Sequence, residues 1–288
     1  MGFVINNNLA ANNSYRNLNA TQNDLSKSLE KLSTGLRINR AADDAAGLSI
    51  SEGLKSQVTG SAQAARNAQD GISLIQTTEG ALTEVHSILQ RMRDLAVQGA
   101  SDTNNDEARD AIKKEGDSLG AELDRMVKSS NFNGIQLLDG TAGANTDGKL
   151  AIQVGTGGDP LLDTIEVDLG DIGDAAGPLA GLGDGTGAKF LVGDNAEATQ
   201  SIIDIDAAIV AVSAQRADLG ATQNRLEHTV KSLNVAGENL QAAQSRITDV
   251  DMASEMVKFT KANILSQAGT AMLAQANQSS QGVLSLLR

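Results

Sequence analysis

The most regular feature of the chain is an apolar residue at every seventh position through its last third. These positions are filled without interruption by Val212, Leu219, Leu226, Leu233, Leu240 and Ile247. Such a repeat predicts a long helix of the coiled-coil type, with these six side chains in its core. A helix over residues 199–247 would be about 70 Å long, which is longer than a small domain is wide.

The first half of the chain has matching apolar stripes at helical spacing. They comprise Leu18, Leu25, Leu29, Leu32 and Leu36, then Ile75, Leu82, Val85, Leu89 and Met92, and in a third segment Ile112, Leu119, Leu123 and Met126. The stripes fit a bundle within one chain and contacts between chains equally well. Gly220 and Gly237 lie inside the predicted long helix, where each costs about 1 kcal/mol relative to alanine. We expect a closely approaching helix to compensate for that cost.

Residues 131–197 differ in composition from both helical halves. They include 15 of the 29 glycines, both prolines, and eleven acidic residues against Lys149 and Lys189. The segments 149–154 and 163–170 favour strands, because apolar and polar residues alternate in the second and a glycine-rich turn separates the two. Residues 181–190 are too rich in glycine for a stable element. The fold class predicted is therefore mainly α, with a small β-hairpin and acidic loops in the middle.

Both ends of the chain are uncharged. No charged side chain precedes Arg16, and none occurs from Ser266 to Leu287, although the last residues are as apolar as VLSLL. Fully burying Val283, Leu284, Leu286 and Leu287 would contribute roughly 6–12 kcal/mol. Ordering the backbone costs about 1–2 kcal/mol per residue, so these four side chains cannot hold the C-terminal segment folded alone. The ends are expected to order only against other molecules.

Composition excludes several classes of function. The net charge of −13 and the isoelectric point near 4.6 disfavour nucleic acid and anionic membrane as partners. Cysteine is absent, and His86 and His228 belong to no HExxH pair, so we expect no metal site, no cofactor and no enzyme activity. No apolar stretch is long enough for a transmembrane helix, and the N-terminus lacks the features of a cleaved signal peptide.

Several segments resemble one family closely. LEKLSTGLRINRAADDAAGLSISEGL (29–54), ARNAQDGISLIQTTEGAL (65–82) and QRMRDLAVQGAS (90–101) are similar to the N-terminal region of bacterial flagellins. RADLGATQNRLEHTVKSL (216–233), SRITDVDMASEM (245–256) and ILSQAGTAMLAQANQSSQGVLSLLR (264–288) resemble the flagellin C-terminal region. The resemblance covers nearly all of 1–140 and 198–288.

The resemblance implies a hairpin-like subunit of the flagellar filament. Residues 1–44 and 249–288 would be terminal helices of the innermost layer, 45–130 and 198–248 a helical bundle, and 131–197 the β-hairpin and loops. Copies would polymerise head to tail into a helical tube used for motility. The candidate polymerisation residues are Val4, Ile5, Leu9, Leu18, Leu25, Leu29, Leu32, Ile264, Leu273, Val283, Leu284, Leu286 and Leu287.

The same resemblance implies location and partners. The protein would leave the cell without a cleaved signal peptide and reside in the extracellular filament, with hook-associated and cap proteins at the filament ends. A flagellar export chaperone would bind Ile264 to Leu287. Contact with a host Toll-like receptor would involve Gln90, Arg91, Leu95 and Glu115. The alternatives are a hook–filament junction protein, which shares the terminal regions, and a stand-alone coiled-coil protein, which would form a stable dimer or trimer in dilute solution.

Overall fold

The computed structural model describes residues 8–143, 147–170 and 190–286, with residues 279–286 described by their backbone alone. The chain divides into two compact units. We call residues 1–58 and 238–288 the terminal unit, and residues 59–237 the central unit. These divisions lie inward of the boundaries at 44 and 249 expected from the sequence.

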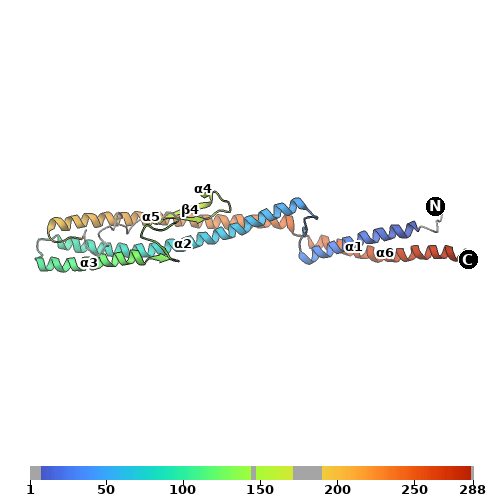
Figure 1. The fold of residues 1–288 in the computed structure, drawn as a ribbon, viewed down its shortest axis with the longest axis horizontal. Helices are drawn as coiled ribbons and strands as arrows, with labels where there is room; N and C mark the ends of the chain where they lie inside the picture. Colours follow the sequence, from blue (N-terminus) through green and yellow to red (C-terminus); the bar gives the residue numbers. More distant parts are fainter. Residues whose placement is uncertain (1–7, 144–146, 171–189, 287–288) are drawn as a thin grey trace. The chain divides into compact units, whose positions relative to one another are not determined.

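In the terminal unit, helices α1 (Leu9–Thr34) and α6 (Met252–Leu286) lie side by side (Figure 1). Helix α1 begins after Asn8, whose Oδ1 accepts a hydrogen bond from the backbone N–H of Ala11 at 3.0 Å. It ends at Gly35, which adopts the left-handed conformation with φ 75°. The helix therefore stops ten residues before position 44, the limit expected for the N-terminal helix.

The central unit is a helical bundle built on three long helices. They are α2 (Ala45–Gly99), α3 (Asp106–Ser129) and α5 (Asn195–Thr248), of which α2 and α5 begin or end in the terminal unit. The predicted helices at 105–128 and 199–247 agree with α3 and α5 to within four residues. Their buried side chains are mostly aliphatic and include Ile75, Leu82, Val85, Leu89, Leu123, Ile205 and Val212. None of the described helices has the length and apolarity of a membrane span.

Two small antiparallel sheets complete the central unit. Strands β1 (Asn131–Phe132) and β2 (Ile135–Gln136) are joined by Asn133 and Gly134, both with positive φ, as a tight hairpin turn requires. Strands β3 (Lys149–Gln153) and β4 (Thr164–Asp168) form the predicted hairpin, and its connection includes the short helix α4 (Pro160–Asp163). Residues 181–189 of the predicted glycine-rich loop lie outside the described residues.

Glycines inside helices have different surroundings from those expected. A Cβ at Gly220 or Gly237 would meet no described atom within 4 Å, so the expected close helix approach at these positions is wrong for the single chain. Gly116 in α3 shows that arrangement instead, because a Cβ there would overlap the ring of the fully buried Phe190. The sequence pattern did not identify Phe190 as a core residue, since it follows a loop rich in glycine.

Candidate assembly surfaces

Helices α1 and α6 pair antiparallel through side-chain contacts along their length. Asn8 Nδ2 donates to the carbonyl oxygen of Ala276 at 2.9 Å, and Ser266 Oγ donates to Gln22 Oε1 at 3.3 Å. Ser28 Oγ donates to Glu255 Oε1 at 2.7 Å. The apolar side chains at this contact, such as Leu18 and Leu25, are half-buried. Among the described residues of the terminal unit, the only apolar side chains that are buried belong to Ile38 and Ala262.

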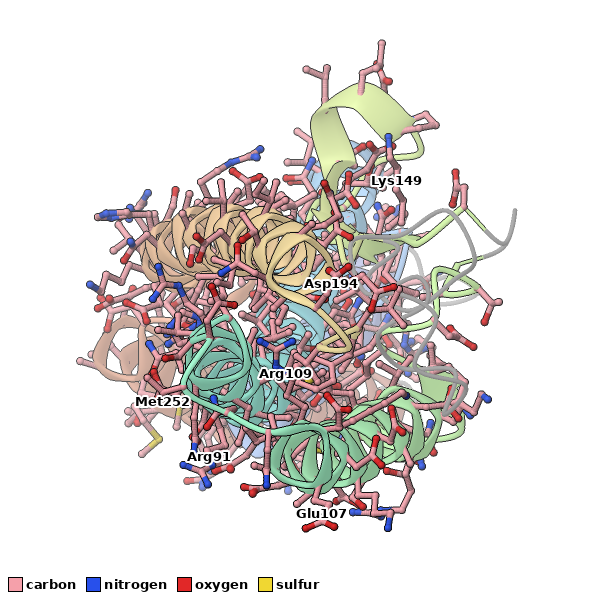
Figure 2. All side chains as sticks on the ribbon, turned by 90° about the vertical axis from the view of Figure 1, so that its left-hand side faces the viewer. Arg91, Glu107, Arg109, Lys149, Asp194 and Met252 are labelled. Carbon is pink, nitrogen blue, oxygen red and sulfur yellow. The ribbon has the colours of Figure 1, made fainter. Side chains whose placement is uncertain are left out.

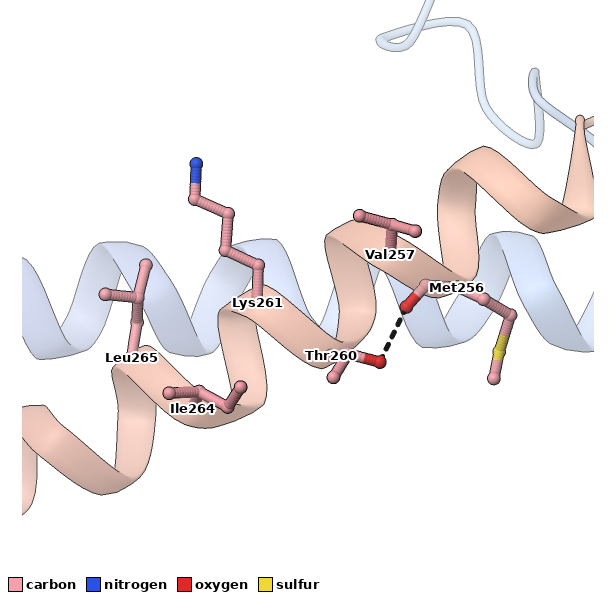
Figure 3. Close-up of a pocket in the computed structure, with 6 residues that line it drawn as sticks. All are labelled: Met256, Val257, Thr260, Lys261, Ile264 and Leu265. Atoms are coloured by element: carbon pink, nitrogen blue, oxygen red, sulfur yellow. Dashed lines mark hydrogen bonds between the residues drawn. The ribbon is translucent and has the colours of Figure 1, made fainter.

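The outer face of α6 exposes an apolar stripe. Its members are Met252, Met256, Val257, Ile264, Leu265 and Met272, which are between 48% and 69% exposed. Within it, Met256, Val257, Ile264 and Leu265 line a depression of about 480 Å³ together with Thr260 and Lys261 (Figure 3). Thr260 Oγ is occupied by a hydrogen bond to the carbonyl oxygen of Met256 at 2.8 Å, so the depression is nearly free of unpaired polar groups.

The predicted polymerisation residues divide by exposure. Leu9, Leu29 and Ile264 are exposed, at 70%, 56% and 61%. Leu18, Leu25, Leu32 and Leu273 are half-buried at the α1–α6 contact. Val4, Ile5 and Leu287 lie outside the described residues, and so do the side chains of Val283, Leu284 and Leu286. The described members therefore supply both the packing within the terminal unit and part of its exposed surface.

A carboxylate is buried where α1 meets α6. Glu255 is 4% exposed, accepts the hydrogen bond from Ser28, and lies 2.9 Å from Lys258 Nζ. Burial raises the pKa of Glu255, but the hydrogen bonds from Ser28 and Lys258 outweigh it, so the pKa is lower than its ordinary value. This contact could not be predicted from local sequence patterns, because its two residues are 227 positions apart.

Hydrogen bonds join the residues that follow α1 to the residues between α5 and α6 and at the end of α5. The backbone N–H of Arg37 donates to the carbonyl oxygen of Thr248 at 2.6 Å, and that of Val250 donates to Gly35 at 3.0 Å. The Arg37 guanidinium adds two hydrogen bonds to the carbonyl oxygen of Ile247, at 3.1 and 2.7 Å. These bonds satisfy carbonyl groups at the end of α5 that have no partner within the helix. We call residues 35–37 and 247–250 the junction.

Comparison with known proteins identifies the family. Residues 5–143 match the model of the bacterial flagellin N-terminal helical region, and residues 202–287 match that of the bacterial flagellin C-terminal helical region. The chain is 51% identical over 287 residues to the flagellin of Halalkalibacterium halodurans, which covers 99% of this chain and 100% of the relative. The chain belongs to the bacterial flagellin family.

Further relatives agree with this assignment. The flagellin of Bacillus subtilis is 49% identical over 304 residues, which is 99% of each chain. Among solved structures, one described as a flagellar hook-associated protein from Vibrio parahaemolyticus is 18% identical with a TM-score of 0.56, and covers 72% of this chain and 100% of that chain. That likeness concerns the fold alone. Flagellins that align over nearly the whole chain at about 50% sequence identity favour a flagellin over the alternative, a hook–filament junction protein.

As a flagellin, the protein is a structural subunit that polymerises into the flagellar filament outside the cell and serves motility. The predicted family, the mainly α fold and the structural role are confirmed. A flagellin is a filament protein and not an enzyme. Within the part of the chain that the structure describes, no cluster of three or more histidine or acidic side chains could hold a metal ion.

The six heptad residues of this flagellin fall into two groups. Val212, Leu219 and Leu226 are buried in the central unit. Leu233, Leu240 and Ile247 are half-buried in the single chain. The heptad stripe is therefore covered at its start and only partly covered toward the end of α5.

The four residues implied in receptor contact lie on α2 and α3. Gln90, Arg91 and Glu115 are exposed, whereas Leu95 is only 2% exposed and belongs to the core. Arg91 points away from the central unit (Figure 2), and its Nε donates to Glu115 Oε1 at 3.0 Å. The pair links α2 to α3 on the surface, and so Arg91 and Glu115 form one exposed charged feature.

Proposed function

We propose that copies of this flagellin contact one another through the exposed faces of α1 and α6, with α6 providing the main apolar surface. The observation that supports this is the terminal unit's shortage of buried apolar side chains, given its many exposed ones. Helix stability in proteins comes mostly from packing an apolar face, and the leucines at the α1–α6 contact are only half-buried in the single chain. Neighbouring copies would supply that packing.

The terminal segments would then order as copies assemble. Val4 and Ile5 at one end, and Val283, Leu284, Leu286 and Leu287 at the other, would be buried only in the filament. Ordering the backbone costs about 1–2 kcal/mol per residue. In the filament, burial of apolar side chains offsets this cost, whereas a free chain lacks such burial. Protease digestion of a dilute, monomeric sample tests this proposal, since termini that resist cleavage before assembly would contradict it.

A pair of variants tests the apolar surface of α6. Replacing Met256 and Ile264 by glutamine keeps helix propensity and approximate size but removes apolar surface. Full burial of each original side chain contributes about 1.5–3 kcal/mol. Losing both contributions would raise the critical concentration for polymerisation at least tenfold. The control replaces both residues by leucine and should polymerise like the unmodified protein. Normal polymerisation of the glutamine variant would overturn the proposal.

The same surface would be occupied before export. We propose that an export chaperone binds Ile264 to Leu287 and keeps the apolar stripe from premature assembly. The chain would leave the cell without cleavage of a signal peptide. Hook-associated and cap proteins would lie at the ends of the filament. Titration calorimetry of the Met256, Ile264 glutamine variant with the purified chaperone should show weaker binding. An intact N-terminus in secreted protein, measured by mass spectrometry, tests export without cleavage.

Contact with a host receptor would depend on the exposed residues among the four that the flagellin resemblance implies. We propose that Gln90, Arg91 and Glu115 touch a host Toll-like receptor, while Leu95 supports them from the core. Arg91→Ala should lower signalling in receptor reporter cells without changing thermal stability. The matched control is Arg125→Ala, which removes another exposed arginine with an α3 ion-pair partner, Glu122. Equal signalling by Arg91→Ala and unmodified protein would remove the proposal.

A further inference from the structure

The tip of the β3–β4 hairpin presents two leucines to solvent. Leu161 is 91% and Leu162 80% exposed, more than any other large apolar residue described. Both belong to α4, in a connection whose residues 155–162 have Asp159 as their one charged side chain. The central unit around them has 13 basic and 27 acidic residues, a net charge of −14. The tip is therefore a small apolar spot on a strongly acidic unit.

Local hydrogen bonds fix the shape of the tip. Asp159 Oδ1 accepts from the backbone N–H of Leu161 at 3.0 Å, and Asp163 Oδ2 accepts from that of Asp159 at 3.1 Å. Gln153 Nε2 donates to the carbonyl oxygens of Gly155 and Gly157 at 3.0 and 3.1 Å. A Cβ at either glycine would overlap the carboxylate of Asp163. The leucines are thus held in place, which lowers the entropy lost when a partner covers them.

The same unit has a groove of suitable chemistry. Apolar side chains of Leu74, Phe132, Ile135, Leu150 and Ile152 line a depression of about 390 Å³, and its rim includes Asn67, Asp70 and Gln153. An apolar floor with a polar rim is the usual arrangement around residues that dominate a protein interface. Both the tip and the groove lie in the central unit, on one chain.

We propose that Leu161 and Leu162 of one copy insert into this groove of a second copy during filament assembly. A helical polymer uses heterologous contacts, in which two different surfaces of the same chain meet. Central units that each have a net charge of −14 repel one another, so they should touch where their surfaces are apolar. The tip and the groove meet both requirements. The inference rests on filament assembly and adds a contact separate from the proposed surface of α6.

A labelling experiment tests whether the tip becomes covered by another copy. The chain has no cysteine, so Leu161→Cys introduces a single thiol. Its reaction with a maleimide should be fast in the monomer and at least tenfold slower in the filament. Slow labelling of the monomer would overturn the proposal, because residues of the same chain would then cover the tip. Equal rates in monomer and filament would overturn it as well.

Cross-linking tests the groove. Leu162→Cys and Asp70→Cys chains are prepared separately, mixed, polymerised and treated with a short bis-maleimide. Covalent dimers are expected in the mixed filament, and far fewer in filaments of either variant alone. The control mixes Leu162→Cys with Glu107→Cys, an exposed position on α3, and should give few dimers. Dimers of Leu162→Cys chains alone, or none in the Asp70→Cys mixture, would overturn the groove as the binding surface.

An assembly measurement separates this inference from the proposed role of α6. Changing Leu161 and Leu162 to glutamine should raise the critical concentration at least tenfold, whereas changing both to methionine should leave it within twofold. Circular dichroism checks that the monomers fold equally. Normal assembly of the Leu161, Leu162 glutamine variant, alongside failed assembly of the Met256, Ile264 glutamine variant, would reject the tip contact and leave the α6 proposal standing.

Discussion

Two glycines in long helices should respond in opposite ways to alanine. Gly220 on α5 has open space where a Cβ would lie, so Gly220→Ala should stabilise the monomer by up to about 1 kcal/mol. At Gly116 on α3 the same change would push against Phe190, and overpacking of this kind costs about 1–3 kcal/mol. Urea unfolding of both variants measures the difference. A stabilised Gly116→Ala would show that Phe190 can move aside at little cost.

The buried Glu255 should make the terminal unit sensitive to acid. Because its pKa is lowered in the folded state, its ionised form stabilises the α1–α6 contact above the ordinary carboxyl range. That stabilisation is lost as the pH falls below the ordinary value of 4.5 and through the lowered pKa. Glu255→Gln should therefore weaken the filament at pH 7 and show a smaller further loss in acid. Turbidity of filaments titrated from pH 7 to pH 3 measures both effects.

A charged surface residue serves as the control for the acid titration. Asp24 is exposed on α1 and belongs to the same unit, so Asp24→Asn should retain the acid sensitivity of the unmodified filament. Identical titration curves for the unmodified protein and Glu255→Gln would contradict the role of Glu255. The Ser28–Glu255 hydrogen bond joins α1 to α6, whereas the backbone hydrogen bonds of the junction join the residues after α1 to the end of α5 and the residues that follow it.

At the scale of elements, Arg37 should control the stability of the junction. Its guanidinium donates twice to the carbonyl oxygen of Ile247, next to the backbone bonds between residues 35–37 and 248–250. Arg37→Ala removes both donors and a positive charge near the C-terminal end of α5, where cations are favourable. Hydrogen exchange at Val250 should become several-fold faster. Arg37→Lys keeps the charge and should give an intermediate rate; unchanged exchange in Arg37→Ala would contradict this role.

Sequence periodicity predicted the long helices, but it did not predict interactions between residues that are far apart in the sequence. The heptad repeat located α5 nearly to its ends, and alternation located β4, because both patterns are local properties of the chain. The early end of α1 depends on the left-handed conformation of Gly35, and periodicity alone gives no sign of it. The pairs Ser28–Glu255 and Gly116–Phe190 depend on segments brought together by folding. Among the proposed surfaces, the apolar stripe of α6 was partly predicted, through Ile264, and the leucine tip was not.

For the whole molecule, charge is distributed unevenly between the units. The terminal unit has ten basic and nine acidic residues, a net charge of +1, whereas the central unit has −14. In the assembly proposed above, central units of neighbouring copies come close together and repel one another, whereas the nearly neutral terminal units meet with little electrostatic cost. Apolar contacts must exceed that repulsion for the filament to form.

Salt should therefore promote polymerisation. Raising the ionic strength from about 0.01 M to about 0.15 M shortens the screening length from about 30 Å to about 8 Å, which weakens repulsion between central units but leaves apolar contacts in place. The critical concentration should fall several-fold, as measured by sedimentation of seeded filaments. Asp106→Asn with Glu107→Gln removes two negative charges from the first turn of α3, and this variant should need less salt. A critical concentration that rises with salt would show instead that attraction between opposite charges dominates assembly.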